Sequence, residues 1–86
     1  MDEWRFTDKL RHTVNHRRLS QRRVAERSNL DAAYVNRLLT GERRNPSAQT
    51  IIKLALGLAL SADETDELLD AAGYPAIKDL FNNIIA

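Results

Sequence analysis

Apolar residues in the N-terminal part of the chain recur at the spacing of an α-helix. Phe6, Leu10 and Val14 repeat every fourth residue, which predicts a first helix that ends near Arg17. The apolar positions elsewhere also follow helical spacing, and no segment shows the period of two that is typical of a strand. No internal repeat, low-complexity tract or linker divides the sequence. The pattern therefore predicts an all-α fold.

Two short helices, at about residues 21–28 and 32–39, follow with a very short connection between them. Ser20 and Asp31 precede them, and each is an N-cap candidate because its side-chain oxygen can accept an N–H of the next turn. Asn29 lies in the connection, and asparagine is the residue that best tolerates positive φ after glycine. These features predict two helices joined by a tight turn.

The C-terminal half is expected to contain a fourth and a fifth helix. Ser47 opens the fourth helix, in which two apolar stripes predict burial on most sides. The first stripe consists of Ile51, Leu54, Ala55 and Leu58, and the second consists of Ile52, Leu56 and Leu60. The run Ser-Ala-Asp-Glu at residues 61–64 is a capping box that begins the fifth helix. Gly73 and Pro75 end that helix.

A sixth, amphipathic helix is expected at residues 77–86, after a domain that spans residues 1–76. Its apolar positions fit the i, i+3, i+4, i+7, i+8 pattern, and they are Ile77, Leu80, Phe81, Ile84 and Ile85. This stripe can pack back on its own domain or form a dimer contact about a two-fold axis. We favour the dimer contact, because a small domain with modest contacts at a single site gains from paired sites.

The charges are divided unevenly along the 86 residues of the chain, whose formal net charge is only +1. Residues 1–50 contain 11 Lys and Arg residues against 6 acidic residues, which is +5, whereas residues 51–86 contain 2 lysines against 6 acidic residues, which is −4. This asymmetry favours a polyanionic partner for one face. The alternative is a salt-bridged helical surface.

The residues that the sequence lacks exclude several classes of function. With no cysteine, neither a disulfide scaffold nor a thiolate-bound metal is available. His12 and His16 are four residues apart on one helix, but no third ligand completes a metal site. The chain has no glycine-rich phosphate loop and no serine with a plausible base, and its longest apolar run, residues 54–60, is too short to cross a membrane. We therefore expect a cytoplasmic protein with no enzymatic activity, cofactor, metal or membrane contact.

Two short helices joined by a tight turn among basic residues have the arrangement of a helix-turn-helix. Residues 19–41, followed by Asn-Pro-Ser at residues 45–47, resemble the helix-turn-helix family of phage repressors and Cro proteins, also called xenobiotic-response-element-like regulators. The matching residues are Leu19, Ser20, Gln21, Ala25, Leu30, Val35, Arg37 and Gly41. The resemblance covers about residues 6–75, and it implies a compact five-helix, lambda-repressor-like domain that binds double-stranded DNA as a homodimer.

The outward side of the helix at residues 32–39 is the candidate surface for the major groove. The candidate base contacts on it are Ala32, Ala33, Asn36 and Arg37. Arg37 can read guanine O6 and N7, although it could instead pair with Glu26 or another surface acid. Asn36 could read adenine or bind a phosphate.

A second set of residues is expected to contact the phosphate backbone. For Gln21 this contact is implied by the family resemblance. The candidates are Gln21, Arg22, Tyr34, Arg43, Arg44 and Asn45. Tyr34 could instead pack on the core.

Together these features predict a sequence-specific transcriptional regulator of the repressor type that binds double-stranded DNA. The resemblance implies that it blocks or alters the recruitment of polymerase at an operator. The alternative is an antitoxin-like protein-interaction module on the same fold, whose acidic half and apolar tail would bind a toxin or another protein partner.

Overall fold

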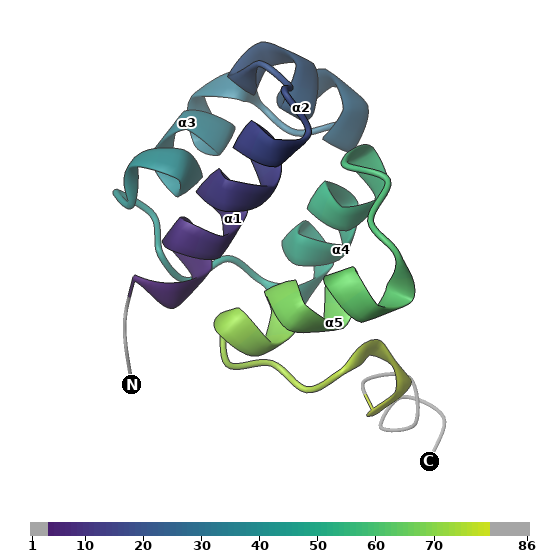
Figure 1. Ribbon diagram of the computed structural model, residues 1–86. Helices are drawn as coiled ribbons and strands as arrows, with labels where there is room; N and C mark the ends of the chain where they lie inside the picture. Colours follow the sequence, from purple (N-terminus) through teal and green to yellow (C-terminus); the bar gives the residue numbers. More distant parts are fainter. Residues whose placement is uncertain (1–3, 80–86) are drawn as a thin grey trace.

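The computed structural model describes residues 4–79, which fold into five α-helices and the start of a further helical turn. The helices are α1 (Arg5–His16), α2 (Gln21–Ser28), α3 (Ala32–Thr40), α4 (Ala48–Gly57) and α5 (Ala62–Ala71). They contact one another in a closed ring, in the order α1, α3, α2, α4, α5 and back to α1 (Figure 1). No strand occurs in residues 4–79, and the predicted all-α class is confirmed. Residues 77–79 are helical, and the rest of the expected sixth helix lies outside the described residues.

Three serines cap helices at the positions that the sequence indicates. Each accepts the backbone N–H three residues later at 3.1 Å, and they are Ser20, Ser47 and Ser61. Glu64 completes the predicted capping box by accepting the N–H of Ser61 at 2.9 Å. The prediction for Asp31 is wrong in one respect. Asp31 occupies the N-cap position of α3, but its exposed side chain faces solvent and makes no capping hydrogen bond.

Several turns use the left-handed conformation. Asn29 (φ 53°), as predicted, and Gly41 (φ 86°) adopt it, and they end α2 and α3. Arg18 and Ala59 also adopt it, each with a φ of 55°, although a residue with a Cβ loses about 1–2 kcal/mol in this conformation. After α4 the strain is offset in part by the N–H of Leu60, which donates to a carbonyl of the last turn at 2.9 Å.

The hydrophobic core lies inside the ring of helices. Phe6, Leu10 and Val14 of α1 are buried, as their spacing predicts. The other helices contribute Val24, Ala25, Val35, Leu38, Ile51, Leu54, Ala55, Leu58, Leu68 and Leu69. Because every helix supplies at least two of these side chains, no helix can change its position without disturbing the shared core.

The expectation that α4 is buried on most sides is wrong. Its first apolar stripe is buried, but Leu56 of the second stripe is 76% exposed, and Ile52 and Leu60 are only partly buried. The reason is geometric, since α4 packs against α2 and α5 and these two neighbours cover only one side of it.

Three ion pairs join α1 and its C-cap residue, Arg17, to α5 on the surface. They are Arg5–Asp70 (2.7 Å), Lys9–Glu67 (3.0 Å) and Arg17–Glu64 (3.0 Å). Exposed pairs of this kind stabilise a fold by only about 0–1 kcal/mol each. Their larger effect is on the charge distribution, because acidic residues of α5 neutralise cations of α1. The salt-bridged surface considered for this chain is therefore found on these two helices.

The C-terminal end of α2 lies directly against the last residue of α4, Gly57. Ser28 is buried there, with 3% of its surface exposed. A Cβ added to Gly57 would overlap Ser28 Oγ and would lie 2.8 Å from the backbone nitrogen of Ser28. It would also lie 2.9 Å from the carbonyl carbon of Arg27. Glycine is therefore required at position 57 by the close approach of two backbones.

Two glycine–alanine exchanges should have opposite effects on stability. Gly57→Ala should lower the free energy of unfolding by about 1–3 kcal/mol, because overpacking outweighs the gain of roughly 1 kcal/mol in helix propensity. Ala59→Gly, the matched control two residues away, should raise it by about 0.5–1 kcal/mol by relieving the left-handed strain. Urea unfolding followed by circular dichroism measures both. A stabilising Gly57→Ala exchange would contradict the close approach of α2 and α4.

Glu64 holds two groups at the N-terminus of α5. Its Oε1 accepts the backbone N–H of Ser61, and both carboxylate oxygens accept from Nη2 of Arg17 at 3.0–3.1 Å. The Ser61 N–H and, after it, the Arg17 guanidinium lower the pKa of Glu64 below its ordinary value of 4.5. Because the pKa is lowered by folding, ionised Glu64 stabilises the fold above pH 4.5, and this contribution is lost as the pH falls through the folded value.

The difference in unfolding free energy between the native protein and Glu64→Gln should therefore depend on pH. We expect a constant difference in favour of the native protein near neutral pH, and a difference that shrinks as the pH falls below about 4.5. Urea unfolding of both proteins at a series of pH values measures it. A difference that stays constant down to strongly acidic pH would show that the carboxylate charge has no part in the cap.

Candidate nucleic-acid interface

Helices α2 and α3 form the helix-turn-helix that the sequence predicts. After α2, Asn29 turns the chain, and the N–H of Leu30 donates to the carbonyl of Ala25 at 3.0 Å. Val35 and Leu38 of α3 are completely buried against the helices that α3 contacts, α1 and α2. The opposite side of α3 is thereby turned outward.

All four candidate base contacts lie on this outward side. Ala32, Ala33, Asn36 and Arg37 are exposed and follow the i, i+1, i+4, i+5 spacing of one helix face. Tyr34, a candidate phosphate contact, is different because its side chain is partly buried and packs against the core. The ring of Tyr34 thus packs on the core, which was the alternative to a phosphate contact.

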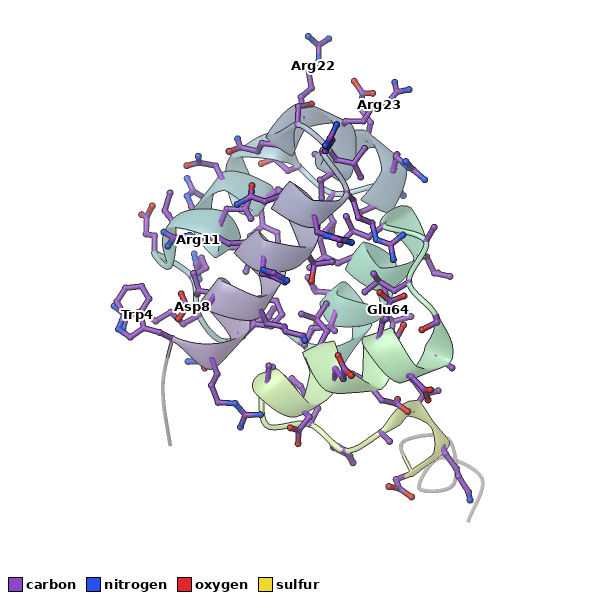
Figure 2. The ribbon with its side chains drawn as sticks, viewed as in Figure 1. Trp4, Asp8, Arg11, Arg22, Arg23 and Glu64 are labelled. Atoms are coloured by element: carbon purple, nitrogen blue, oxygen red, sulfur yellow. The ribbon has the colours of Figure 1, made fainter. Side chains whose placement is uncertain are left out.

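The alternative partner of Arg37 is engaged elsewhere. Glu26 pairs with Arg22 (3.3 Å) and Arg23 (3.9 Å) of its own helix, and these two arginines project from α2 at the edge of the molecule (Figure 2). Arg22 was expected to contact a phosphate. In the structure its guanidinium pairs with Glu26 of the same helix. Arg37 makes no ion pair within residues 4–79, so its guanidinium keeps its donors for a partner outside the domain.

Gln21 and Asn36 meet between the start of α2 and the middle of α3. Asn36 Nδ2 donates to Gln21 Oε1 at 2.9 Å, and Gln21 Nε2 donates to the carbonyl of Ala32 at 3.5 Å. The sequence suggested separate contacts for these two residues. They are 15 residues apart, and only the packing of α2 on α3 brings them together.

The loop between α3 and α4 contains the remaining candidates. Arg43 and Asn45 are exposed. Arg44 is partly buried, and its Nε donates to the carbonyl of Gly41 at 2.9 Å. Its guanidinium also lies over the ring of Trp4, 4.2 Å from the centroid. Arg44, expected as a phosphate contact, is thus held against its own loop by a tryptophan for which the apolar pattern gave no signal.

Arg11 is a surface cation that the sequence analysis did not select. Its Nε donates at 2.6 Å to the carbonyl of Leu39 in the last turn of α3, beside which it lies in Figure 2. The backbone N–H of Arg43 reaches the same turn and donates to the carbonyl of Arg37 at 3.0 Å. The free carbonyls of a helix C-terminus attract cations. Arg11 therefore places positive charge at this end of α3.

The segment that contains α2, α3 and the loop after α3 is net basic. Residues 20–47 contain six arginines and three acidic residues. Acidic residues of α5 pair with Arg5, Lys9 and the C-cap residue Arg17 of α1, whereas a single acid, Glu26, pairs with both Arg22 and Arg23, so this segment keeps a net positive charge. This distribution suits a partner with a repeating negative charge.

Other kinds of site find little support in the described residues. His12 and His16 stack with ring centroids 6.2 Å apart. In residues 4–79 no group of three or more His, Cys, Asp or Glu side chains could hold a metal ion. None of the helices there is both long enough and apolar enough to cross a bilayer.

One of the five expected dimer contacts lies in the described part of the chain. Ile77 is 36% exposed, and its backbone N–H donates to Asp66 Oδ1 at 2.9 Å. The other four, Leu80, Phe81, Ile84 and Ile85, lie outside the described residues.

Comparison with known proteins agrees with this geometry. A family model described as a helix-turn-helix domain matches residues 5–68, from the first residue of α1 into α5. No curated protein and no solved structure gives a significant match. The matched segment is most of the chain and contains α2, α3 and the turn between them. The chain therefore belongs to the helix-turn-helix family of DNA-binding domains.

Proposed function

We propose that this protein is a transcriptional repressor that recognises a specific sequence in double-stranded DNA with α3. The observation that carries the proposal is the outward face of α3, where Arg37, which has no ion pair within residues 4–79, lies beside Asn36. The guanidinium of arginine matches guanine O6 and N7 in the major groove. Ala32 and Ala33 present only methyl groups, which can contact a thymine methyl or allow close approach. No enzymatic step or cofactor is part of the proposal.

The phosphate contacts would come from both ends of this surface. The first turn of α2 offers backbone N–H groups to an anion beside Gln21. Arg43 and Asn45 are exposed in the loop after α3, and Arg11 lies at the same end. Contacts at two ends would fix how α3 lies in the groove, since phosphate contacts set the register of a protein on the duplex.

Two copies bound to paired half-sites would strengthen the binding. Half-sites of helix-turn-helix dimers are about 34 Å apart along the duplex. We propose residues 77–86 as the dimer contact, on the basis of their apolar stripe. A dimer on an operator would then exclude polymerase from the same DNA.

The antitoxin-like alternative gains less support from the structure. Its toxin-binding face was to include the acidic half of the chain, but Glu64, Glu67 and Asp70 of α5 are already paired with cations of α1.

Selection of bound duplexes from a random pool at about 150 mM salt tests the proposal. We expect enrichment of one motif, and a palindrome with half-sites about one helical turn apart if two copies bind. Enrichment of a single half-site would overturn the dimer alone. Failure to enrich any motif would overturn sequence-specific DNA binding.

Arg37→Ala and Arg43→Ala should weaken binding in different ways. Loss of Arg37 should cost about 1–3 kcal/mol on the selected duplex and relax the preference at one base pair. Loss of Arg43 should weaken all duplexes equally and reduce the slope of log K against log salt by about one. Fluorescence anisotropy with matched and mismatched duplexes measures both effects. An equal loss on all duplexes for Arg37→Ala would make Arg37 a phosphate contact.

A further inference from the structure

Trp4 is a large aromatic residue whose position is explained neither by the core nor by helix capping. It occupies the N-cap position of α1, but its side chain makes no capping hydrogen bond. Trp4 is 40% exposed and lies outside the buried core. It projects from the start of α1 on the same side of the molecule as Arg11 (Figure 2). The indole ring contacts the loop that follows α3.

Two residues of this loop touch the indole. The guanidinium of Arg44 lies over the ring, 4.2 Å from the centroid. Gly41 is buried against the six-membered part of the ring, where a Cβ on Gly41 would overlap the indole. Arg44 Nε also donates to the carbonyl of Gly41 at 2.9 Å and so joins the two loop residues to each other. Trp4, Gly41 and Arg44 thus form a clamp, called here the Trp4 clamp, between the start of α1 and the loop.

Arg43 lies between the two loop residues of the Trp4 clamp. Residues 41–47 contain no helix, so no helical hydrogen bonds hold their backbone. The backbone N–H of Arg43 donates to the carbonyl of Arg37 at 3.0 Å, and the side chain of Arg43 is exposed. Because Gly41 and Arg44 are held by the indole, the backbone of Arg43 is fixed on both sides while its side chain stays at the surface.

A fixed backbone at Arg43 affects binding through conformational entropy. An arginine on a mobile loop holds a phosphate only when the loop is ordered, and this ordering costs part of the binding free energy. The Trp4 clamp orders the loop already in the free protein. Arg44 keeps its charge in the clamp, so its positive charge also remains next to Arg43.

We propose that Trp4 is a positioning residue for DNA binding, which orders the loop after α3 so that Arg43 meets a phosphate at little entropic cost. The inference rests on the proposed function, in which Arg43 contacts the phosphate backbone. It assigns Arg44 to the clamp in place of a phosphate contact of its own.

Hydrogen exchange in the free protein tests the clamp without DNA. Trp4→Leu removes the aromatic face and keeps an apolar side chain. The amide hydrogen of Arg43 should then exchange roughly 2- to 5-fold faster, the factor that corresponds to the loss of an exposed cation–π contact. The amide of Leu30, in the turn between α2 and α3, is the internal control and should not change. Trp4→Phe keeps an aromatic face and should lie closer to the native protein.

Two results of the exchange measurement would overturn the clamp. One is an unchanged rate at Arg43 in Trp4→Leu. The other is an equal acceleration at Arg43 and Leu30, which would show a general loss of stability. Far-UV circular dichroism and thermal unfolding establish that each variant is folded.

DNA binding to the selected duplex tests the positioning role. Trp4→Leu should lower the affinity by a similar factor, roughly 2- to 5-fold. The bound protein still makes the same phosphate contacts, so the slope of log K against log salt should stay native, whereas Arg43→Ala reduces it. In an Arg43→Ala background, Trp4→Leu should have a clearly smaller effect, because the ordered loop no longer serves that contact. Leu56→Ala, which truncates an exposed apolar side chain on α4, is the matched control and should bind as the native protein does.

The outcomes separate this inference from the proposed function. If the native chain enriches no motif, the proposed function fails and the positioning role fails with it. If a motif is enriched but Trp4→Leu binds it as tightly as the native protein, the inference alone is overturned. It is also overturned if Trp4→Leu reduces the salt slope, which would indicate a lost phosphate contact, or weakens binding equally with and without Arg43.

Discussion

The end of α2 rests on the last turn of α4, and the other helices are arranged around this contact. Gly57 has no side chain, which allows the backbone of α4 to approach Ser28 more closely than any other residue would permit. The position of α2 then fixes α3, because Val24 and Ala25 of α2 and the core residues of α3 share one buried cluster. The outward face of α3, which we propose as the DNA-binding surface, therefore depends on a glycine in another helix.

The second constraint is the distribution of charge, which ion pairs between α1 and α5 decide. α5 supplies acidic side chains to Arg5, Lys9 and Arg17, and these cations are withdrawn from the net positive surface. In the segment of α2, α3 and the following loop, Arg22 and Arg23 share one acidic partner, Glu26, and arginines outnumber acidic residues. A chain with a net charge of +1 thus keeps a net basic segment around α2 and α3, and its weak overall charge limits non-specific attraction to polyanions.

Local features could be predicted from the sequence because they depend on neighbouring residues. The cap at Ser20 and the left-handed turn at Asn29 each involve a few adjacent groups, and both were found. Leu56 was predicted to be buried and is exposed, since apolar spacing cannot tell how many neighbours cover a helix. Arg44 was expected to face DNA, but Trp4, 40 positions earlier in the chain, holds it against the loop.

The sequence by itself determined the all-α class, the helix-turn-helix and the set of residues on the outward face of α3. These follow from helical period, capping chemistry and the tolerance of asparagine for positive φ. Only the tertiary structure decided which of those residues act together. The contact of Gln21 with Asn36 and the pairing of α1 with α5 join residues 15 to 65 positions apart. Side chains so distant in the chain meet only after the helices have packed, because no local spacing encodes the position of one helix on another.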